Sequence, residues 1–281
     1  MPQSFLGRRH TLRVDSRHRS GLLLDAGELG RVLLPSRYVP VGLDIDGEIE
    51  VFISMDSEDR PVATTESPLV MAGEFALLTV SAVTRVGAFL DWGMPKDLLL
   101  PFAEQTRRLK AGEEELVHVD VDKVSGRLVA SAKLGKFVAD IAPSGWQGGK
   151  AVSLLVAEKT DLGIKVIVED YCWGLLRCNP GDSVPARGNR CPGYISRIRE
   201  DGLVDISLSP PGYSRIPAVK EHIAGQLSSA EGGFLPVHDK SPPEQVREVF
   251  GVSKKVFKQA VGALYKEGRI RIAKDGIYWL E

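Results

Sequence analysis

The chain has 281 residues, with 36 Lys and Arg, 37 Asp and Glu, and a formal net charge of −1. This length excludes a single small module and fits either one α/β domain or several small domains. Hydrophobic residues make up 43% of the chain, which excludes global disorder. The near-zero net charge excludes a uniformly basic surface, but it is compatible with local basic patches.

The first residues, Met1 to His10, lack the apolar stretch of a signal peptide, and no apolar run approaches the roughly 18 residues of a membrane span. The cysteines are Cys172, Cys178 and Cys191, an odd number without CxxC spacing, and the five His are scattered. We therefore expect a cytoplasmic protein with reduced thiols, and we expect no membrane span, metal site or cofactor.

Two phrases recur along the chain. The first is found at residues 31–35, 97–101 and 173–177, and the second at residues 56–64, 122–130 and 200–208. The first two copies of both phrases share an offset of about 66 residues, which is too long for a solenoid repeat and too short for an α/β domain. The offset predicts tandem small domains.

The middle unit contains five short segments with strand character. They are Phe75–Val83, Val86–Gly93, Leu98–Leu100, Leu116–Asp122 and Arg127–Ala132. Gly87, inside the second segment, indicates a bulge or sharp bend. Five short strands with a longer link between the third and fourth are typical of an OB-type barrel.

Residues 73–131 resemble an S1 RNA-binding domain. The similarity rests on residues 83–89, on the strand Leu98–Leu100 and on residues 122–131. Residues 11–65 and 149–209 look like diverged copies of the same unit. The expected fold is therefore mainly β, with S1-like barrels at 1–67, 68–140 and 145–211.

The pattern becomes helical after Pro217. Val219–Leu227 is amphipathic, Ser241–Glu244 predicts a capping-box start for a helix ending at Gly251, and Ser253 precedes a third helix ending at Gly268. Two short apolar runs then flank Asp275-Gly276, a strong hairpin signal. Three helices and a hairpin predict an α+β winged helix at residues 216–281.

The order of barrels and winged helix resembles the conserved virulence factor B family of bacterial proteins. The similarity is strongest at residues 232–242, 250–258 and 262–265. It implies a cytoplasmic RNA-binding protein that regulates gene expression post-transcriptionally.

OB-type barrels bind single strands on strands 2 and 3 with stacked aromatics and Lys or Arg. In the middle unit we expect RNA contacts from Phe89, Lys96, Asp122 and Arg127, with Trp92 and Phe102 as further rim candidates. The alternatives are a core aromatic at Phe89 and an ion pair at the turn. Two contacts usual in S1 domains are missing, because Val86 and Leu100-Pro101 replace an aromatic residue and a His.

The third unit has more candidates: Tyr171, Trp173, Arg177, Tyr194, Arg197 and Arg199. Arg197 and Arg199 are two apart and would share a strand face unless a bulge intervenes. The alternative is that the aromatics are core and the arginines are solvated. The first unit offers Arg31, Arg37, Tyr38 and Phe52. Its basic leading segment (Arg8, Arg9, His10, Arg13, Arg17, Arg19) either contacts phosphates or is mobile.

In the winged helix the nucleic-acid-binding candidates are Lys254, Lys255 and Lys258 on the third helix, and Arg269, Arg271 and Lys274 on the wing. The helix carries Lys and Gln259, which suits phosphate contact better than base reading. A structural or protein-binding winged helix is the alternative.

No P-loop, GxSxG, HExxH or DxDxDG motif is present, so we expect no enzyme. The expected partner is single-stranded RNA. The alternatives are a DNA-binding transcription regulator that uses the winged helix, and a protein-interaction adaptor on the ribosome or RNA-processing proteins with vestigial barrels.

Overall fold

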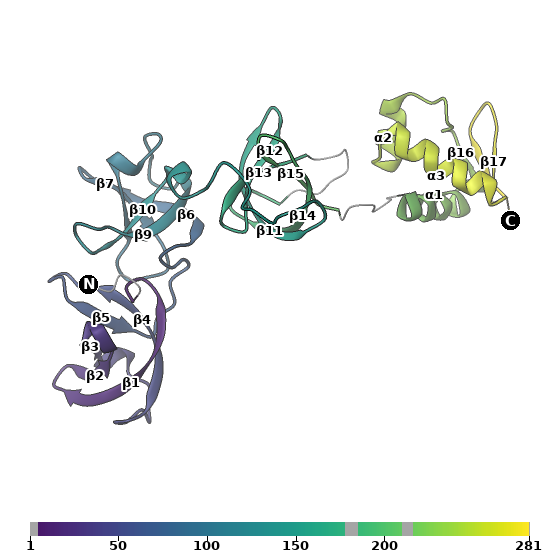
Figure 1. Cartoon of the computed structure of the whole chain (residues 1–281). Helices are drawn as coiled ribbons and strands as arrows, with labels where there is room; N and C mark the ends of the chain where they lie inside the picture. Colours follow the sequence, from purple (N-terminus) through teal and green to yellow (C-terminus); the bar gives the residue numbers. More distant parts are fainter. Residues whose placement is uncertain (1–4, 178–184, 210–215, 281) are drawn as a thin grey trace.

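The computed structural model describes residues 5–177, 185–209 and 216–280. It contains three closed barrels in chain order, followed by a small helical domain with a three-stranded sheet (Figure 1). The expected fold, S1-like barrels and a winged helix, is confirmed. None of the described helices is long and apolar enough to cross a membrane.

Barrel 1 is built from the first five strands, with β5 inserted between β3 and β4 in the pairing order β1-β2-β3-β5-β4. Its strands are β1 (Arg9–His18), β2 (Gly21–Asp25), β3 (Arg31–Pro35), β4 (Glu48–Met55) and β5 (Pro61–Thr64).

Barrel 2 repeats this topology, with closed order β10-β8-β7-β6-β9. Its strands are β6 (Phe75–Val83), β7 (Gly87–Asp91), β8 (Leu98–Pro101), β9 (Glu114–Val121) and β10 (Leu128–Ser131). The five segments expected from the sequence coincide with these strands to within two residues at either end.

Barrel 3 has the order β11-β12-β13-β15-β14. Its strands are β11 (Ala151–Thr160), β12 (Gly163–Val168), β13 (Cys172–Leu176), β14 (Arg190–Ile198) and β15 (Val204–Ser207). Short 3-10 turns follow strands of barrels 1 and 2, at Gly27–Leu29, Ser36–Tyr38, Phe102–Glu104 and Leu134–Lys136, and another, Glu231–Gly233, follows the first helix of the C-terminal domain.

A glycine begins the second strand of each barrel, at positions 21, 87 and 163. A Cβ at Gly87 would collide with the carbonyl of Leu100, and Gly21 and Gly163 lie in the same way against the third strand of their barrels. A side chain there would push the two strands apart at the barrel corner. All three barrels thus need a glycine at this position for the close approach of the third strand, whereas the irregularity in barrel 2 lies in β6, between Val80 and Ala82.

The C-terminal domain contains α1 (Ile216–Ser229), α2 (Pro243–Phe250) and α3 (Lys254–Lys266). Its sheet has the order β16-β18-β17, formed by β16 (Phe234–Leu235), β17 (Ile270–Ile272) and β18 (Ile277–Trp279). Apolar residues of the three helices meet those of the hairpin in one core, including Phe257, Leu264 and Ile277.

The capping box expected at Ser241 is wrong. Pro242 is the N-cap of α2 and makes no side-chain cap bond. Ser241 Oγ instead accepts a hydrogen bond of 3.0 Å from the backbone N–H of His238, so it stabilises the preceding loop. The cap expected at Ser253 is present, because its side chain accepts from the N–H of Val256.

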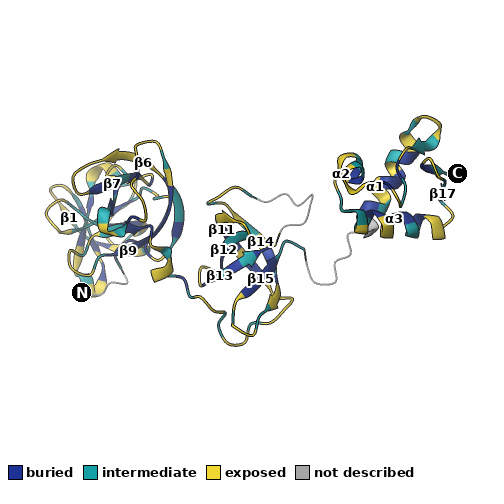
Figure 2. Cartoon of the chain, turned by 90° about the horizontal axis from the view of Figure 1, so that it is seen from above, coloured by how far each residue is buried: buried dark blue, intermediate teal, exposed yellow. Residues whose placement is uncertain are grey.

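Barrels 1 and 2 share a core. Phe52 of β4 is fully buried among the core residues of barrel 2, where its ring meets that of Trp92 edge-on at 5.9 Å. The binding role expected for Phe52 is therefore wrong, because no face of its ring is accessible. Buried residues fill each barrel (Figure 2). Ala72, Val121 and Leu128, which follow barrel 1 in the chain, pack with the core residues of barrel 1. At the rim, the guanidinium of Arg127 donates to Asp59 at 2.7 Å. The two barrels therefore pack directly against each other.

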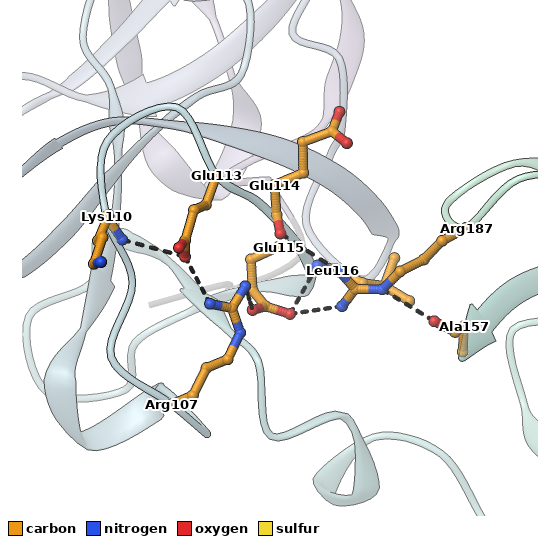
Figure 3. A network of polar contacts seen from close by, with 8 residues as sticks. All are labelled: Arg107, Lys110, Glu113, Glu114, Glu115, Leu116, Ala157 and Arg187. Atoms are coloured by element: carbon orange, nitrogen blue, oxygen red, sulfur yellow. Dashed lines mark hydrogen bonds and ion pairs between the residues drawn. The ribbon is translucent and has the colours of Figure 1, made fainter. Parts of the chain in front are cut away.

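Barrels 2 and 3 meet through a separate apolar cluster that includes Phe75 and Leu116 on one side and Leu155 and Ile167 on the other. Beside it lies a nearly buried carboxylate, Glu115, between two guanidinium groups (Figure 3). Arg107 of barrel 2 approaches Glu115 at 3.2 Å, and Arg187 of barrel 3 donates to it at 2.7 Å. Arg187 also donates to the carbonyl of Ala157 within barrel 3, so its bond to Glu115 connects the two barrels.

Candidate nucleic-acid interface

Each barrel presents one row of side chains on the outside of its sheet, opposite the core. We call it the outer row, and it is defined by cross-strand pairs. In barrel 1 the row comprises Ser16, Leu23, Leu33, Val62 and Ser54. In barrel 2 it comprises Ala82, Phe89, Leu99, Val129 and Asp120. In barrel 3 it comprises Glu158, Lys165, Leu175, Asp205 and Arg197. The rows of barrels 1 and 2 are largely apolar, and that of barrel 3 is charged.

The charged row of barrel 3 carries a cluster of three arginines around one carboxylate. Arg197 and Arg199 donate to Asp205 at 2.8 and 2.5 Å, and Arg177 lies 3.8 Å from it. Three positive charges and one negative charge leave a net charge of +2. The side chain of Asp205 is only 7% exposed, whereas those of Arg177 and Arg197 are 64% and 66% exposed. The carboxylate thus anchors arginines whose outer donors face solvent.

The hydrogen bonds of Arg199, and then of Arg197, hold the pKa of Asp205 at about 2 despite its burial. Asp205 is therefore ionised at neutral pH and keeps the guanidinium groups in place. A bulge lies between Ile195 and Arg197, where the sequence left open a disturbance of the strand face. Because it precedes both arginines, the bulge leaves Arg197 and Arg199 directed at the same carboxylate.

Trp173 lies on β13, two residues before Leu175 of the outer row and on the side of that residue that faces barrel 2. Its ring is half-buried beside the cluster that joins the barrels, and Lys165 Nζ lies 3.9 Å from the ring centroid. Trp173, Leu175 and Arg177 alternate along the strand and therefore share one face. Tyr194 is half-buried on β14, while Tyr171 is exposed and lies away from the row, 6.4 Å from Trp146 between ring centroids.

The candidates of barrel 2 separate into different environments. Phe89 is part of the outer row and outside the core, and Lys96 is exposed. Asp122 accepts hydrogen bonds from Ser125 and so stabilises the turn. Arg127 is not paired with Asp122 but donates to Asp59 of barrel 1. The rim role considered for Trp92 is wrong, because that ring is 6% exposed and its Nε1 donates to the carbonyl of Lys96.

In barrel 1, most candidate cations have acidic or aromatic partners. Arg31 pairs with Asp15 at 2.9 Å, and Arg37 lies over the ring of Tyr38, whose hydroxyl donates to Glu66. The leading basic segment is not a mobile tail, since residues 9–18 form β1. Its arginines 9, 13 and 17 pair with Glu50, Asp46 and Asp44 respectively.

In the winged helix, Lys255 and Lys258 are exposed on α3, and Lys254 lies half-buried near the carbonyl of Lys240. Arg269 does not extend from the wing, because it donates to Glu221 of α1 at 2.9 Å. On the wing itself Lys274 is exposed, and Arg271 lies over the ring of Tyr278.

Two members of the site, Lys165 and Asp205, were missed by the sequence reading. Asp205 occupies the position that is Val62 in barrel 1 and Val129 in barrel 2. A charged residue at a position that is apolar in the other two repeats could have identified Asp205 as a member of the site. Cys172 is buried, which raises the pKa of its thiol to about 11 and leaves it unreactive. Cys178 lies outside the described residues.

Comparisons with known proteins agree with this architecture. A family model described as the CvfB-like winged helix domain matches residues 221–279, and an S1 domain model matches residues 6–66. The S1 match falls on barrel 1, which the motifs had indicated as a diverged copy.

Relatives align over most of the chain. The uncharacterized protein YitL of Bacillus subtilis is 28% identical over 272 residues, covering 94% of this chain and 90% of that protein. Conserved virulence factor B of Staphylococcus aureus is 26% identical over 261 residues, covering 83% and 82%. A crystal structure from Streptococcus pneumoniae, of a multidomain protein with nucleic acid binding domains, covers 99% of both chains at 19% identity and a TM-score of 0.40. The resemblance indicated by the motifs is therefore confirmed, and the chain is similar to the conserved virulence factor B proteins over more than four fifths of its length.

Proposed function

We propose that the chain binds single-stranded RNA on the outer row of barrel 3 and regulates gene expression post-transcriptionally, without catalysis. The observation that carries this proposal is the cluster of Arg177, Arg197 and Arg199 around Asp205 of the outer row, which also contains Lys165 beside the ring of Trp173. Cations that follow a strand's phosphates, next to an aromatic ring on which a base stacks, are how OB-type barrels hold single strands.

RNA is proposed over DNA because the barrels resemble S1 domains. Phe89, Lys96 and Tyr194 are proposed to add contacts, since their environments leave them accessible. Arg31, Asp122 and Arg127 are proposed to act mainly in stabilising their barrels, because their polar atoms already have partners.

A second candidate function is duplex DNA binding by the winged helix. It is favoured by the exposed pair Lys255 and Lys258 on α3, one turn apart and therefore on one face. The same face could instead hold a protein, as an adaptor would require.

The test is to measure binding of the full chain to single-stranded RNA, single-stranded DNA and duplex DNA over a salt series. The variant Arg197→Ala/Arg199→Ala should weaken RNA binding and lower the slope of log K against log salt by about 1.4, since each single-strand phosphate contact contributes about 0.7. A matched control, Arg13→Ala/Arg17→Ala, removes two ion-paired arginines of barrel 1 and should change neither value appreciably.

A preference for duplex DNA, lost in Lys255→Ala/Lys258→Ala, would replace this proposal with the second candidate. An unchanged slope in Arg197→Ala/Arg199→Ala would remove barrel 3 from the site. The absence of binding to all three nucleic acids at low salt would favour the adaptor.

A further inference from the structure

A cavity of about 740 Å³ lies between barrels 2 and 3, outside the arginine cluster. Residues 132–136, which lead out of barrel 2, form one wall, and Glu158, Lys165 and Trp173 of barrel 3 form the opposite wall. The volume is within the roughly 300–1,000 Å³ of pockets that hold small ligands, so a nucleotide has room in it.

The cavity is continuous with the outer row of barrel 3. Lys165 belongs to both, since it lines the cavity and pairs across the sheet with Leu175, the neighbour of Asp205. Trp173 lines the cavity from the same strand as Leu175. A strand that crosses the arginine cluster and continues past Leu175 therefore reaches the cavity at the ring of Trp173.

The cavity is lined by the carboxylates of Glu115 and Glu158 and by five cations, and the cations divide into two groups. Arg107 and Arg187 are held by Glu115, and Arg107 also donates to Glu113 at 2.6 Å, so these arginines build the wall (Figure 3). Lys133 and Lys165 are in no ion pair within the part of the chain that the structure describes.

Lys136 donates to Glu104 at 2.7 Å but is half exposed, and an ammonium has three donors. The lysines therefore supply positive charge that the carboxylates of the cavity wall do not neutralise, and such charge attracts phosphate groups.

We propose that this cavity is a second part of the single-strand site, in which Lys133 and Lys136 contact phosphates of a strand that leaves the outer row of barrel 3 past Trp173. The inference rests on the proposed function and extends it to barrel 2. A base stacked on Trp173 replaces the contact between Lys165 and the ring, and the released ammonium faces the same phosphates.

The test compares two double variants of the full chain in binding to a fluorescently labelled single-stranded oligouridylate of about 20 nucleotides over a salt series. Lys133→Ala/Lys136→Ala should lower the salt slope by about 1.4 and weaken binding by about 5- to 25-fold at 0.1 M salt. The control Arg19→Ala/Lys123→Ala removes the same charge from exposed positions elsewhere, in barrel 1 and in the β9–β10 turn, and should have a much smaller effect. Lys133→Arg/Lys136→Arg keeps both charges and should bind RNA like the unaltered chain.

Bound RNA should also protect Lys133 and Lys136, but not Lys123, from acetylation measured by mass spectrometry. If Arg197→Ala/Arg199→Ala weakens binding while Lys133→Ala/Lys136→Ala matches the control, the cavity is excluded and the proposed function stands. If the unaltered chain binds no RNA, the proposed function itself fails.

Discussion

One carboxylate, Asp205, organises the charged surface of barrel 3. It stands where barrels 1 and 2 have a valine, and it collects the three guanidinium groups that would otherwise repel one another. Its low pKa means that the folded state favours the ionised form, so its contribution to stability is present above about pH 4 and is lost as the pH falls towards 2.

We predict that Asp205→Asn lowers the free energy of unfolding by about 2 kcal/mol at pH 6, because a pKa difference of one unit corresponds to about 1.4 kcal/mol. The difference from the unaltered protein should shrink as the pH falls from 4 to 2. Urea unfolding followed by tryptophan fluorescence measures both. Asp161→Asn, in an exposed turn of the same barrel, serves as the control and should cost little; a gap that does not change with pH would contradict the assignment.

At the scale of single residues, the sequence identified candidate binding residues but not the residues with which they form ion pairs. Arg197 and Arg199 could be chosen from their spacing and surroundings, because strand periodicity is local. The ion pair of Arg127 with Asp59 and that of Arg269 with Glu221 join residues far apart in the chain, so no local pattern distinguishes them from free cations.

At the scale of elements, the glycine that begins the second strand of each barrel shows that two strands can approach closely only where no side chain stands between them. A different glycine, Gly188, has φ +83 and follows Arg187 in the segment that faces barrel 2, where a Cβ would overlap the side chain of Leu77. Gly112 has nearly the same backbone angle, φ +84, but nothing lies within 4 Å of its Cβ position.

We predict that Gly188→Ala destabilises the protein more than Gly112→Ala. Both substitutions cost about 1–2 kcal/mol for a left-handed backbone, and only the first must also displace Leu77. Thermal unfolding of the two variants measures the difference. Equal losses would show that Leu77 moves aside at no cost.

The sequence predicted the strands well because each barrel strand is short and apolar on alternate residues. The repeat of the two phrases further located equivalent strands, so the topology followed from the S1 resemblance. Strand β16 was missed, because two residues carry no periodicity. The cap at Ser241 was misassigned because Pro242, one residue later, is the N-cap of α2. The hydroxyl of Ser241 accepts a hydrogen bond from the backbone of His238 instead.

On the scale of the whole molecule, the barrels are joined by buried contacts that no single repeat contains. Phe52 lies in the core of barrel 2 although it belongs to barrel 1, and an apolar residue on the outer side of a strand looks in sequence like any core residue. The sequence therefore predicted the number and order of barrels but not the cavity between barrels 2 and 3, which depends on their docking.

We predict that Glu115→Gln loosens the contact between barrels 2 and 3, because the substitution leaves Arg107 and Arg187 without their shared negative charge. The expected loss in unfolding free energy is about 1–3 kcal/mol, less than for a fully buried pair, since both arginines are nearly half exposed. Urea unfolding and the rate of limited proteolysis between the barrels measure the effect. The neighbouring Glu114→Gln keeps the backbone contact of Glu114 and should behave like the unaltered protein.

The outer row has a consequence for how such a chain can diversify. Its side chains lie on the side of the sheet away from the core, so exchanging them costs little packing energy in the barrel that carries them. After duplication of a barrel, this row is the part that can change most freely, and a valine-to-aspartate exchange with neighbouring arginines is enough to turn an apolar surface into an ionic one. Ligand preference in a tandem array can thus evolve one barrel at a time while the shared cores hold the array together.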